Sequence, residues 1–403
     1  MTTVLFVGGG RHQRRAIQRV QELGHEVVAV DRSPDALGLL AADVGELVDF
    51  TDVAGVIEVG RRHEVDGVLT VAADRAVPVV AAVAEALELP GIGVETAQRM
   101  THKLEMRRAF AEAGVPQPPF AAIKSLESVP VALGVVPLPA VLKPADSGGQ
   151  RAVFRIESRE ELERDLAEAT AESPTGVAIL EEFVDGIELN GIVVVRGGEP
   201  LLLTLSDRLR PPGIGFGVGW IHVFPPSIPD EQLARARTIA VDAVRALGLR
   251  DGIAFPQLIA AADGRVAVVE VAARIAGGQM ADLVRHAVGV DVVEIAVRQA
   301  LGEEIPDDVA LPRFEQPLAI RFFTASPGPL PTGRVVRVGD LAPVLAGDGV
   351  VQAETYIEVG ETIRPVRRDG DRRGYVIAVG DDSGEALRRA EEAASRFTVE
   401  VEA

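Results

Sequence analysis

Runs of apolar residues alternate with helix-like patterns over the first 95 residues. Three apolar runs predict buried strands, at residues 3–9, 25–31 and 65–71. Residues 11–24 predict an amphipathic helix that ends at Gly24, and residues 75–89 predict another helix. This alternation of strand and helix is typical of a parallel, doubly wound sheet.

The remaining residues predict a different organisation. Residues 96–120 predict a helix that ends at Gly114 and then a proline-rich connector, which marks a domain boundary. Strands and helices follow in mixed order to a final helix at residues 383–397. We therefore expect three parts: an α/β domain at 1–95, an α+β domain at 96–312 and a C-terminal α+β region at 313–403.

The composition narrows the class of protein. With 47% hydrophobic and 25% charged residues, the chain suits a packed globular protein, and its lack of cysteine rules out disulfides and thiolate catalysis. The net charge of −19 argues against binding to nucleic acid or to anionic membranes. The N-terminal charges follow the first apolar run, which is the wrong order for a signal peptide. We expect a soluble cytoplasmic protein, with a homodimer as the default assembly.

Gly8, Gly9 and Gly10 follow the first predicted strand, and Asp31 ends the second. This arrangement weakly resembles a dinucleotide-binding fingerprint, although the spacing is not G-x-G-x-x-G. A tight turn from strand to helix is the better interpretation of the glycines.

A hairpin at residues 252–272 offers a candidate metal site. Asp263-Gly264 is a strong two-residue turn signal, and such a turn makes Ala262 face Arg265 and Gln257 face Glu270. A carboxylate and an amide oxygen on one face, beside substrate phosphates, suit Mg²⁺. The alternative is a Gln–Glu hydrogen bond without a metal. If the second strand continues, Arg274 follows Glu270 on the same face.

Lys143 ends a predicted strand and precedes a Ser-Gly-Gly turn at residues 147–149. In a Walker-type loop the lysine would follow the glycines and a helix would come next, whereas here another strand follows. A flap whose backbone N–H groups close over phosphates fits this order. Further on, the segment 179–189 could offer strand backbone to an adenine edge, with Glu188 in reach of ribose hydroxyls.

Together these segments resemble the ATP-grasp superfamily, and in particular its branch of L-amino acid ligases and other carboxylate–amine ligases. The resemblance lies in five motifs, which occur in the family's order and spacing: "THKLEMRRAFAEAGVPQPPF", "VLKPADSGGQRAV", "LEEFVDGIEL", "FPQL" and "VEVAARIAGG". It implies an α/β N-terminal parallel-sheet domain, a two-lobed α+β ATP-grasp fold and a C-terminal mixed α+β extension that completes the catalytic lobe.

The resemblance also implies a role for each matching residue. ATP phosphates would contact Lys103 and Lys143, under a flap made of Ser147, Gly148 and Gly149. Adenine would meet the strand formed by Glu181, Glu182, Phe183 and Val184, and ribose would meet Glu188. Mg²⁺ would bind Gln257 and Glu270, the transferred phosphoryl group or acyl phosphate would meet Arg274, and an amino acid substrate would meet Gly277 and Gly278.

The implied reaction forms an acyl phosphate from ATP and a small-molecule carboxylate, and an amine then displaces phosphate. Two alternatives stay open: a carboxylase or formyl-phosphate type enzyme of a nucleotide pathway, and a catalytically weak nucleotide-binding protein. Many members carry Glu where this chain has Gln257, and Asn where it has Ala272, so the number of metal ions is open.

The scarcity of lysine gives a prediction. The chain has three lysines, Lys103, Lys124 and Lys143, among 41 basic residues, so arginine serves almost wherever a cation is needed. Lys143→Arg should lower turnover about a hundredfold, because a longer planar cation misplaces the phosphates. Lys103→Arg should be impaired less severely, because a side chain on a helix has more room to adjust.

The matched control is Lys124→Arg, which lies in no phosphate motif and should keep near-normal activity. Steady-state turnover of the folded variants tests this comparison. Equal activity of the Lys124 and Lys143 variants would remove Lys143 from the proposed site.

Overall fold

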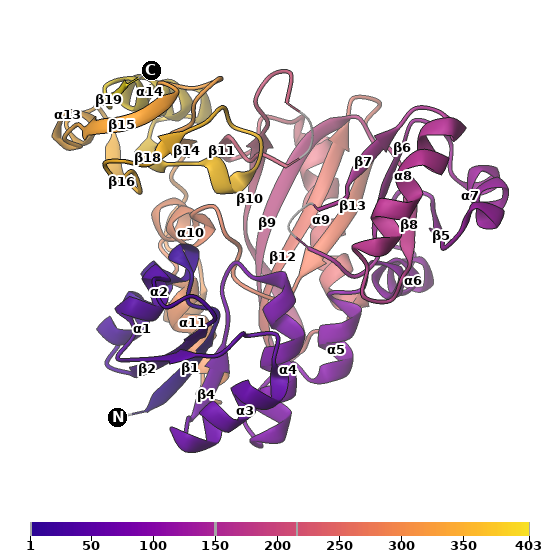
Figure 1. Ribbon diagram of the computed structural model, residues 1–403, viewed down its shortest axis with the longest axis horizontal. Helices are drawn as coiled ribbons and strands as arrows, with labels where there is room; N and C mark the ends of the chain where they lie inside the picture. The colour runs from indigo at the N-terminus through magenta and orange to yellow at the C-terminus, as the bar shows by residue number, and fades with distance from the viewer. Residues whose placement is uncertain (1, 149–150, 215–216, 403) are drawn as a thin grey trace.

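The computed structural model describes residues 2–148, 151–214 and 217–402 (Figure 1). The first domain holds a parallel sheet in the order β3-β2-β1-β4. Its strands are β1 (Thr3–Val7), β2 (Glu26–Asp31), β3 (Val44–Leu47) and β4 (Gly67–Leu69). Its helices are α1 (Arg11–Glu22), α2 (Leu37–Ala41), α3 (Val53–Arg62) and α4 (Val77–Ala86), with a short 3-10 turn η1 (Asp74–Ala76).

The continuous apolar run of β1 follows from burial on both faces of this sheet. Val4 and Phe6 belong to one hydrophobic core, and Leu5 and Val7 belong to another on the opposite face. Parallel sheets covered on both faces characteristically have such uninterrupted apolar strands. The first core continues into the large sheet and α10, so the first domain is packed firmly against the rest of the chain.

Two helices lead out of the first domain, where the sequence predicted one. They are α5 (Val94–Arg99) and α6 (Lys103–Ala113), and α6 ends at Gly114 in the left-handed conformation, as predicted. A small antiparallel sheet follows, in the order β5-β8-β6-β7. Its strands are β5 (Phe120–Ile123), β6 (Ala140–Pro144), β7 (Phe154–Ile156) and β8 (Ala178–Glu182), with helices α7 (Val129–Val135) and α8 (Arg159–Ala171) and a 3-10 turn η2 (Leu126–Ser128).

A large antiparallel sheet, in the order β13-β12-β9-β10-β11-β14-β18-β16, forms the centre of the molecule. Its first strands are β9 (Gly186–Arg196), β10 (Glu199–Leu209), β11 (Ile221–Phe224), β12 (Gly252–Ala261) and β13 (Val266–Ala272). The C-terminal region adds β14 (Leu318–Phe322), β16 (Val350–Thr355) and β18 (Gly374–Val379). The helices of this part are α9 (Asp230–Ala246), α10 (Met280–Val288), α11 (Val292–Ala300) and α12 (Asp307–Ala310).

The C-terminal region also forms a second, smaller sheet, in the order β17-β15-β19. Its elements are β15 (Gly333–Val338), β17 (Thr362–Ile363), β19 (Val399–Glu402), α13 (Ala342–Leu345), α14 (Ser383–Ser395) and a 3-10 turn η3 (Asp369–Asp371). These observations confirm the expected fold class, whereas the division at residues 95 and 312 stays a prediction. In the described ranges, no helix is both long and apolar enough to cross a bilayer.

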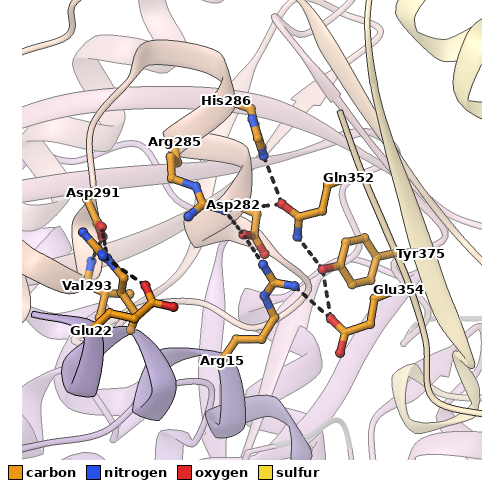
Figure 2. Close-up of polar contacts among 11 residues, drawn as sticks. Arg15, Glu22, Asp282, Arg285, His286, Asp291, Val293, Gln352, Glu354 and Tyr375 are labelled. Carbon is orange, nitrogen blue, oxygen red and sulfur yellow. Dashed lines mark hydrogen bonds and ion pairs between the residues drawn. The ribbon is translucent and has the colours of Figure 1, made fainter. Parts of the chain in front are cut away.

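Helix α10 lies between the first domain and the C-terminal region (Figure 1). Figure 2 shows Arg15 of α1 reaching Asp282 in the first turn of α10 at 3.4 Å and Glu354 of β16 at 3.0 Å. Arg19, one turn along α1, binds Asp291, which caps α11. This polar network fixes α10, and with it the glycine loop that precedes the helix, relative to both neighbours.

Candidate functional site

The β12–β13 hairpin places Gln257 directly opposite Glu270, as predicted. The predicted turn is wrong, however. The N–H of Ala261, rather than that of Ala262, donates to the Arg265 carbonyl at 2.8 Å, so three residues form the turn. The register then shifts between Gln257 and Leu258, because Val269 is an extra residue in a β-bulge. The longer turn and the bulge cancel, which restores the predicted pair.

Gln257 and Glu270 fit a magnesium ion. Both are partly buried, and the Gln257 amide nitrogen points to Oδ1 of Asn190 at 3.5 Å, which leaves its oxygen for other partners. Within residues 217–402 no hydrogen bond joins Gln257 to Glu270, so the alternative of a simple Gln–Glu pair gains no support. The described residues contain no cluster of three metal-binding side chains. A metal here would therefore take two protein oxygens and complete its shell with phosphates and water.

Lys143 lies in a buried ion cluster. Its Nζ is 2.7 Å from Oε2 of Glu181, whose Oε1 accepts a hydrogen bond from Nε of Arg107 at 2.8 Å. Burial lowers the pKa of Lys143, and Glu181 opposes that shift. Burial alone would raise the pKa of Glu181, but Arg107 and Lys143 outweigh it and hold the value at about 2. The cluster thus keeps a carboxylate ionised beneath the lysine.

Lys103 is the first residue of α6, and its side chain contacts both the predicted flap and the β12–β13 hairpin. Its Nζ donates to the backbone oxygen of Ser147 at 2.7 Å and lies 3.9 Å from Oε1 of Glu270. The lysine therefore connects the predicted flap to the hairpin. Of the three predicted flap residues, Ser147 and Gly148 are described and Gly149 lies outside the described residues.

Contacts with neighbouring segments hold the predicted adenine strand in place. The backbone N–H groups of Glu182 and Phe183 donate to Pro119 and Pro139. The Glu182 carboxylate pairs with Arg265 at 3.2 Å, and the guanidinium of Arg155 lies 4.3 Å from the centre of the Phe183 ring. Val184, which completes the segment, is buried. These N–H groups are occupied, so an adenine contact on this strand would use other backbone groups; the nucleotide-binding roles stay predictions.

Glu188, the predicted ribose ligand, is held by two guanidiniums, one on β10 and one just after it. Its oxygens lie 2.5 Å from Nη1 of Arg208 and 3.2 Å from Nε of Arg210. A carboxylate anchored in this way has a fixed position, which suits a group that must accept hydrogen bonds from a ligand.

Arg274 lies beyond the end of β13, because the strand ends at Ala272. The alternation expected for a longer strand does not apply, and the guanidinium instead meets Asp74 of the first domain. Nε and Nη2 of Arg274 lie 2.7 and 2.6 Å from Oδ1 of Asp74. A Cβ on Gly148 would lie 3.2 Å from the Cβ of Asp74, so this carboxylate also borders the flap.

Asp74 was not predicted from the sequence, although its position gives a signal. The residue follows shortly after β4, at the carboxyl end of a parallel strand, where α/β domains commonly bind ligands. A bridge between Val71 and Ile275 holds the segment against Arg274, and the N–H of Ala72 donates to the Ile275 carbonyl at 3.0 Å. The first domain thereby contributes directly to the site.

Gly277 and Gly278 lie in the loop before α10, where the chain passes close to two walls. A Cβ on Gly277 would lie 3.1 Å from the Cβ of Ala72. A Cβ on Gly278, whose φ is +70°, would lie 3.2 Å from Nε2 of His222 and 3.4 Å from Nη1 of Arg372. Glycine at 278 is therefore required by both backbone conformation and space.

Two of these neighbours, His222 and Arg372, form a basic cluster with Arg208, and none of the three was predicted from the sequence. All three side chains are at least nine-tenths buried. Burial and then the two arginines lower the pKa of His222 to about 3, so it is neutral, and chiefly burial lowers the pKa of Arg372. Asp369 partly compensates, at 3.5 Å from Arg372 and 4.0 Å from Arg208.

Two family models match most of the chain from residue 102 onwards. A family model for the carbamoyl-phosphate synthase L chain, ATP binding domain, matches residues 102–308. A second model, for L-amino acid ligase C-terminal domain 2, matches residues 326–402.

Similar proteins extend over nearly the whole chain. The formate-dependent phosphoribosylglycinamide formyltransferase of Ignicoccus hospitalis is 29% identical over 98% of this chain and 95% of its own. The L-amino acid ligase of Bacillus licheniformis has a TM-score of 0.82 at 22% identity, covering 100% and 99% of the two chains. Phosphoribosylglycinamide synthetase of Anaerococcus prevotii has a TM-score of 0.81 at 19% identity, covering 100% of both. At these identities the two solved structures support the fold alone.

The ion pair between Asp74 and Arg274 gives a prediction. Asp74→Ala should lower the maximal rate of ADP release by about 10 to 100-fold, because Arg274 loses the anion that positions it, while the KM for ATP stays within about twofold. If the carboxylate acts through the guanidinium, the double variant Asp74→Ala, Arg274→Ala should be no slower than Arg274→Ala alone.

The matched control is Arg75→Gln, which changes an exposed residue in the same turn. Rates measured on folded proteins decide between the possibilities. Additive losses in the double variant would show that Asp74 acts independently of Arg274.

Proposed function

The chain belongs to the family of the carbamoyl-phosphate synthase L chain ATP-binding domain, within the ATP-grasp superfamily, and on this basis we propose that it joins a carboxylate to an amine. Membership makes the protein an ATP-grasp, ATP-dependent ligase. The finer assignment is that the carboxylate is activated as an acyl phosphate and that an amine then forms a dipeptide-like or amide bond.

The buried basic cluster of Arg208, His222 and Arg372 is the observation that carries this proposal. Arg372 belongs to the segment that matches the L-amino acid ligase C-terminal model, and it lies beside Gly278 at the end of the glycine loop. Burial lowers the pKa of Arg372 because its positive charge has lost contact with water. A bound anion stabilises that charge, so binding of an anion beside Arg372 is favourable. A substrate carboxylate has the charge and the planar shape for this site.

The proposed reaction has two steps. A carboxylate oxygen of the substrate attacks the γ-phosphorus of ATP, the bond to the β-phosphate oxygen breaks, and ADP leaves. The amine nitrogen then attacks the acyl carbon, the C–O bond to phosphate breaks, and phosphate and a proton are released. Negative charge accumulates at the phosphoryl group in the first step and on the departing phosphate in the second.

The residues of the site would stabilise that charge. Lys103 and Lys143 would hold the phosphates, and Arg274 would face the transferred phosphoryl group. Gln257 and Glu270 would hold Mg²⁺, which when bound neutralises phosphate charge and orients the oxygens. Fixed cations act strongly in a site that excludes water, because they need no reorganisation during the reaction.

A second candidate is formyl transfer in a nucleotide pathway. It is supported by the relative from Ignicoccus hospitalis, which is named a formate-dependent phosphoribosylglycinamide formyltransferase and matches 98% of this chain. Formate is also a carboxylate, so both candidates share the first step. They differ in the size of the acid and in the amine.

The experiment is a screen for ADP release from ATP and Mg²⁺ with amino acids, small carboxylates and pairs of them, followed by mass spectrometry of the products. We expect rapid ADP release only with a suitable acid and amine together, and a product whose mass equals their sum minus water. Release that instead requires formate and phosphoribosylglycinamide would replace the proposal by formyl transfer.

Glu270→Gln serves as the control, because it removes the one carboxylate of the metal pair while the fold is kept. This variant should lose ADP release with every pair. ATP binding by the wild-type protein without turnover in any condition would overturn the ligase assignment and favour a nucleotide-binding protein.

A further inference from the structure

Arg107 of α6 lies where the two sheets of the nucleotide site meet. It is 1% exposed and is the largest fully buried side chain among the described residues. It follows Lys103 by one helical turn, so both side chains lie on the same face of α6. An unrelieved buried guanidinium would be costly, so its partners indicate what it stabilises.

The first partners are two carbonyl groups of the β-bulge. Nη1 of Arg107 donates to the Val268 oxygen at 3.1 Å, and Nη2 donates to the Val269 oxygen at 2.7 Å. Successive carbonyls of a regular strand point to opposite sides, so two that reach one guanidinium require the irregular backbone of the bulge. Because β13 is an edge strand, these groups have no neighbouring strand to satisfy them.

The bulge decides where Glu270 points. In the register that follows the turn, Leu258 pairs with Val268, and without the extra residue Gln257 would pair with Val269. Glu270 would then project from the opposite face, because side chains alternate along a strand. The guanidinium therefore stabilises the irregularity that places Glu270 across from Gln257.

A further partner, besides Gln117, connects Arg107 to Lys143. Nε of Arg107 donates to one oxygen of Glu181, and Nζ of Lys143 lies 2.7 Å from the other oxygen. Glu181 belongs to β8 of the small sheet, whereas Val268 and Val269 belong to β13 of the large sheet. One side chain thus bridges the lobe that carries Lys143 and the lobe that carries Glu270.

From these contacts we propose that Arg107 is a positioning residue, which sets the distance between the phosphate-binding Lys143 and the metal ligand Glu270. It acts through the bulge on one side and through Glu181 on the other, and touches neither ATP nor metal itself. The inference rests on the proposed function, because it assumes that Glu270 binds metal and Lys143 binds phosphate.

The test is Arg107→Lys, which keeps a positive charge for Glu181 but has a single nitrogen and cannot donate in parallel to both bulge carbonyls. The affinity for Mn²⁺ in the presence of ADP, measured by electron paramagnetic resonance, should weaken by about tenfold or more. The turnover number should fall by about a hundredfold, as expected for a misplacement of about 1 Å. The KM for ATP should change by less than about threefold.

Glu181→Gln distinguishes the effect of Arg107 on Lys143 from its effect on Glu270. It removes the carboxylate that anchors Lys143 and leaves the contacts between Arg107 and the bulge carbonyls in place. This variant should raise the KM for ATP by about tenfold and leave Mn²⁺ affinity within about twofold. Arg108→Lys is the matched control, since Arg108 is the next residue on α6, is exposed and pairs only with Glu105 among the described residues. It should behave as wild type in all three measurements.

Each outcome has a distinct meaning. Unchanged Mn²⁺ affinity in folded Arg107→Lys overturns the positioning role. An equal loss of Mn²⁺ affinity in Arg107→Lys and Glu181→Gln also overturns it. If Arg107→Lys does not fold, the double variant Arg107→Gln, Glu181→Gln removes both charges together, and native Mn²⁺ affinity in that protein overturns the role. Failure of the wild-type protein to bind Mn²⁺ with ADP overturns instead the metal assignment in the proposed function.

Discussion

The central constraint in this molecule is the burial of one carboxylate, Glu181, between two cations. Its side chain is 4% exposed, and Arg107 and Lys143 occupy both of its oxygens. Removing one partner of such a buried cluster typically costs about 3–5 kcal/mol, because a charge is left without compensation. The cluster requires α6 and the small sheet to meet at fixed distances, and Arg107 also binds two carbonyls of β13 in the large sheet. The proposed nucleotide site lies at that meeting point, so its geometry follows from the same requirement.

The first domain directly borders the proposed site. Its link to the ATP-grasp lobes is backbone pairing between Val71 and Ile275, which brings Asp74 to Arg274. On the other side of the glycine loop, Arg15 of the same domain reaches α10 and β16 (Figure 2). Three segments distant in sequence therefore surround the loop that contains Gly277 and Gly278, and a displacement of any one of them would alter the space around these glycines.

Local pattern was sufficient to predict most strands and helices and the motifs that they carry. β1 could be predicted because both of its faces are buried, and the end of α6 because Gly114 adopts a conformation that favours glycine. The partners of those motifs could not be predicted. Asp74 lies 200 positions from Arg274, and nothing in either local sequence encodes their meeting. Arg372 likewise reaches Gly219 across 153 positions. The pair of Gln257 and Glu270 was predicted correctly from an incorrect turn, because the bulge at Val269 compensates for the extra turn residue.

Because the bulge compensates for the longer turn, the length of the turn does not decide which two side chains face each other at the base of the hairpin. A two-residue turn with regular strands and a three-residue turn with a bulge are alternative solutions that put the same two side chains opposite each other. Both solutions leave the twelve residues 258–269 between Gln257 and Glu270, so a relative can exchange one solution for the other without gaining or losing a residue. An alignment without gaps across this hairpin therefore identifies the facing pair correctly, although it gives no sign of which turn the relative adopts.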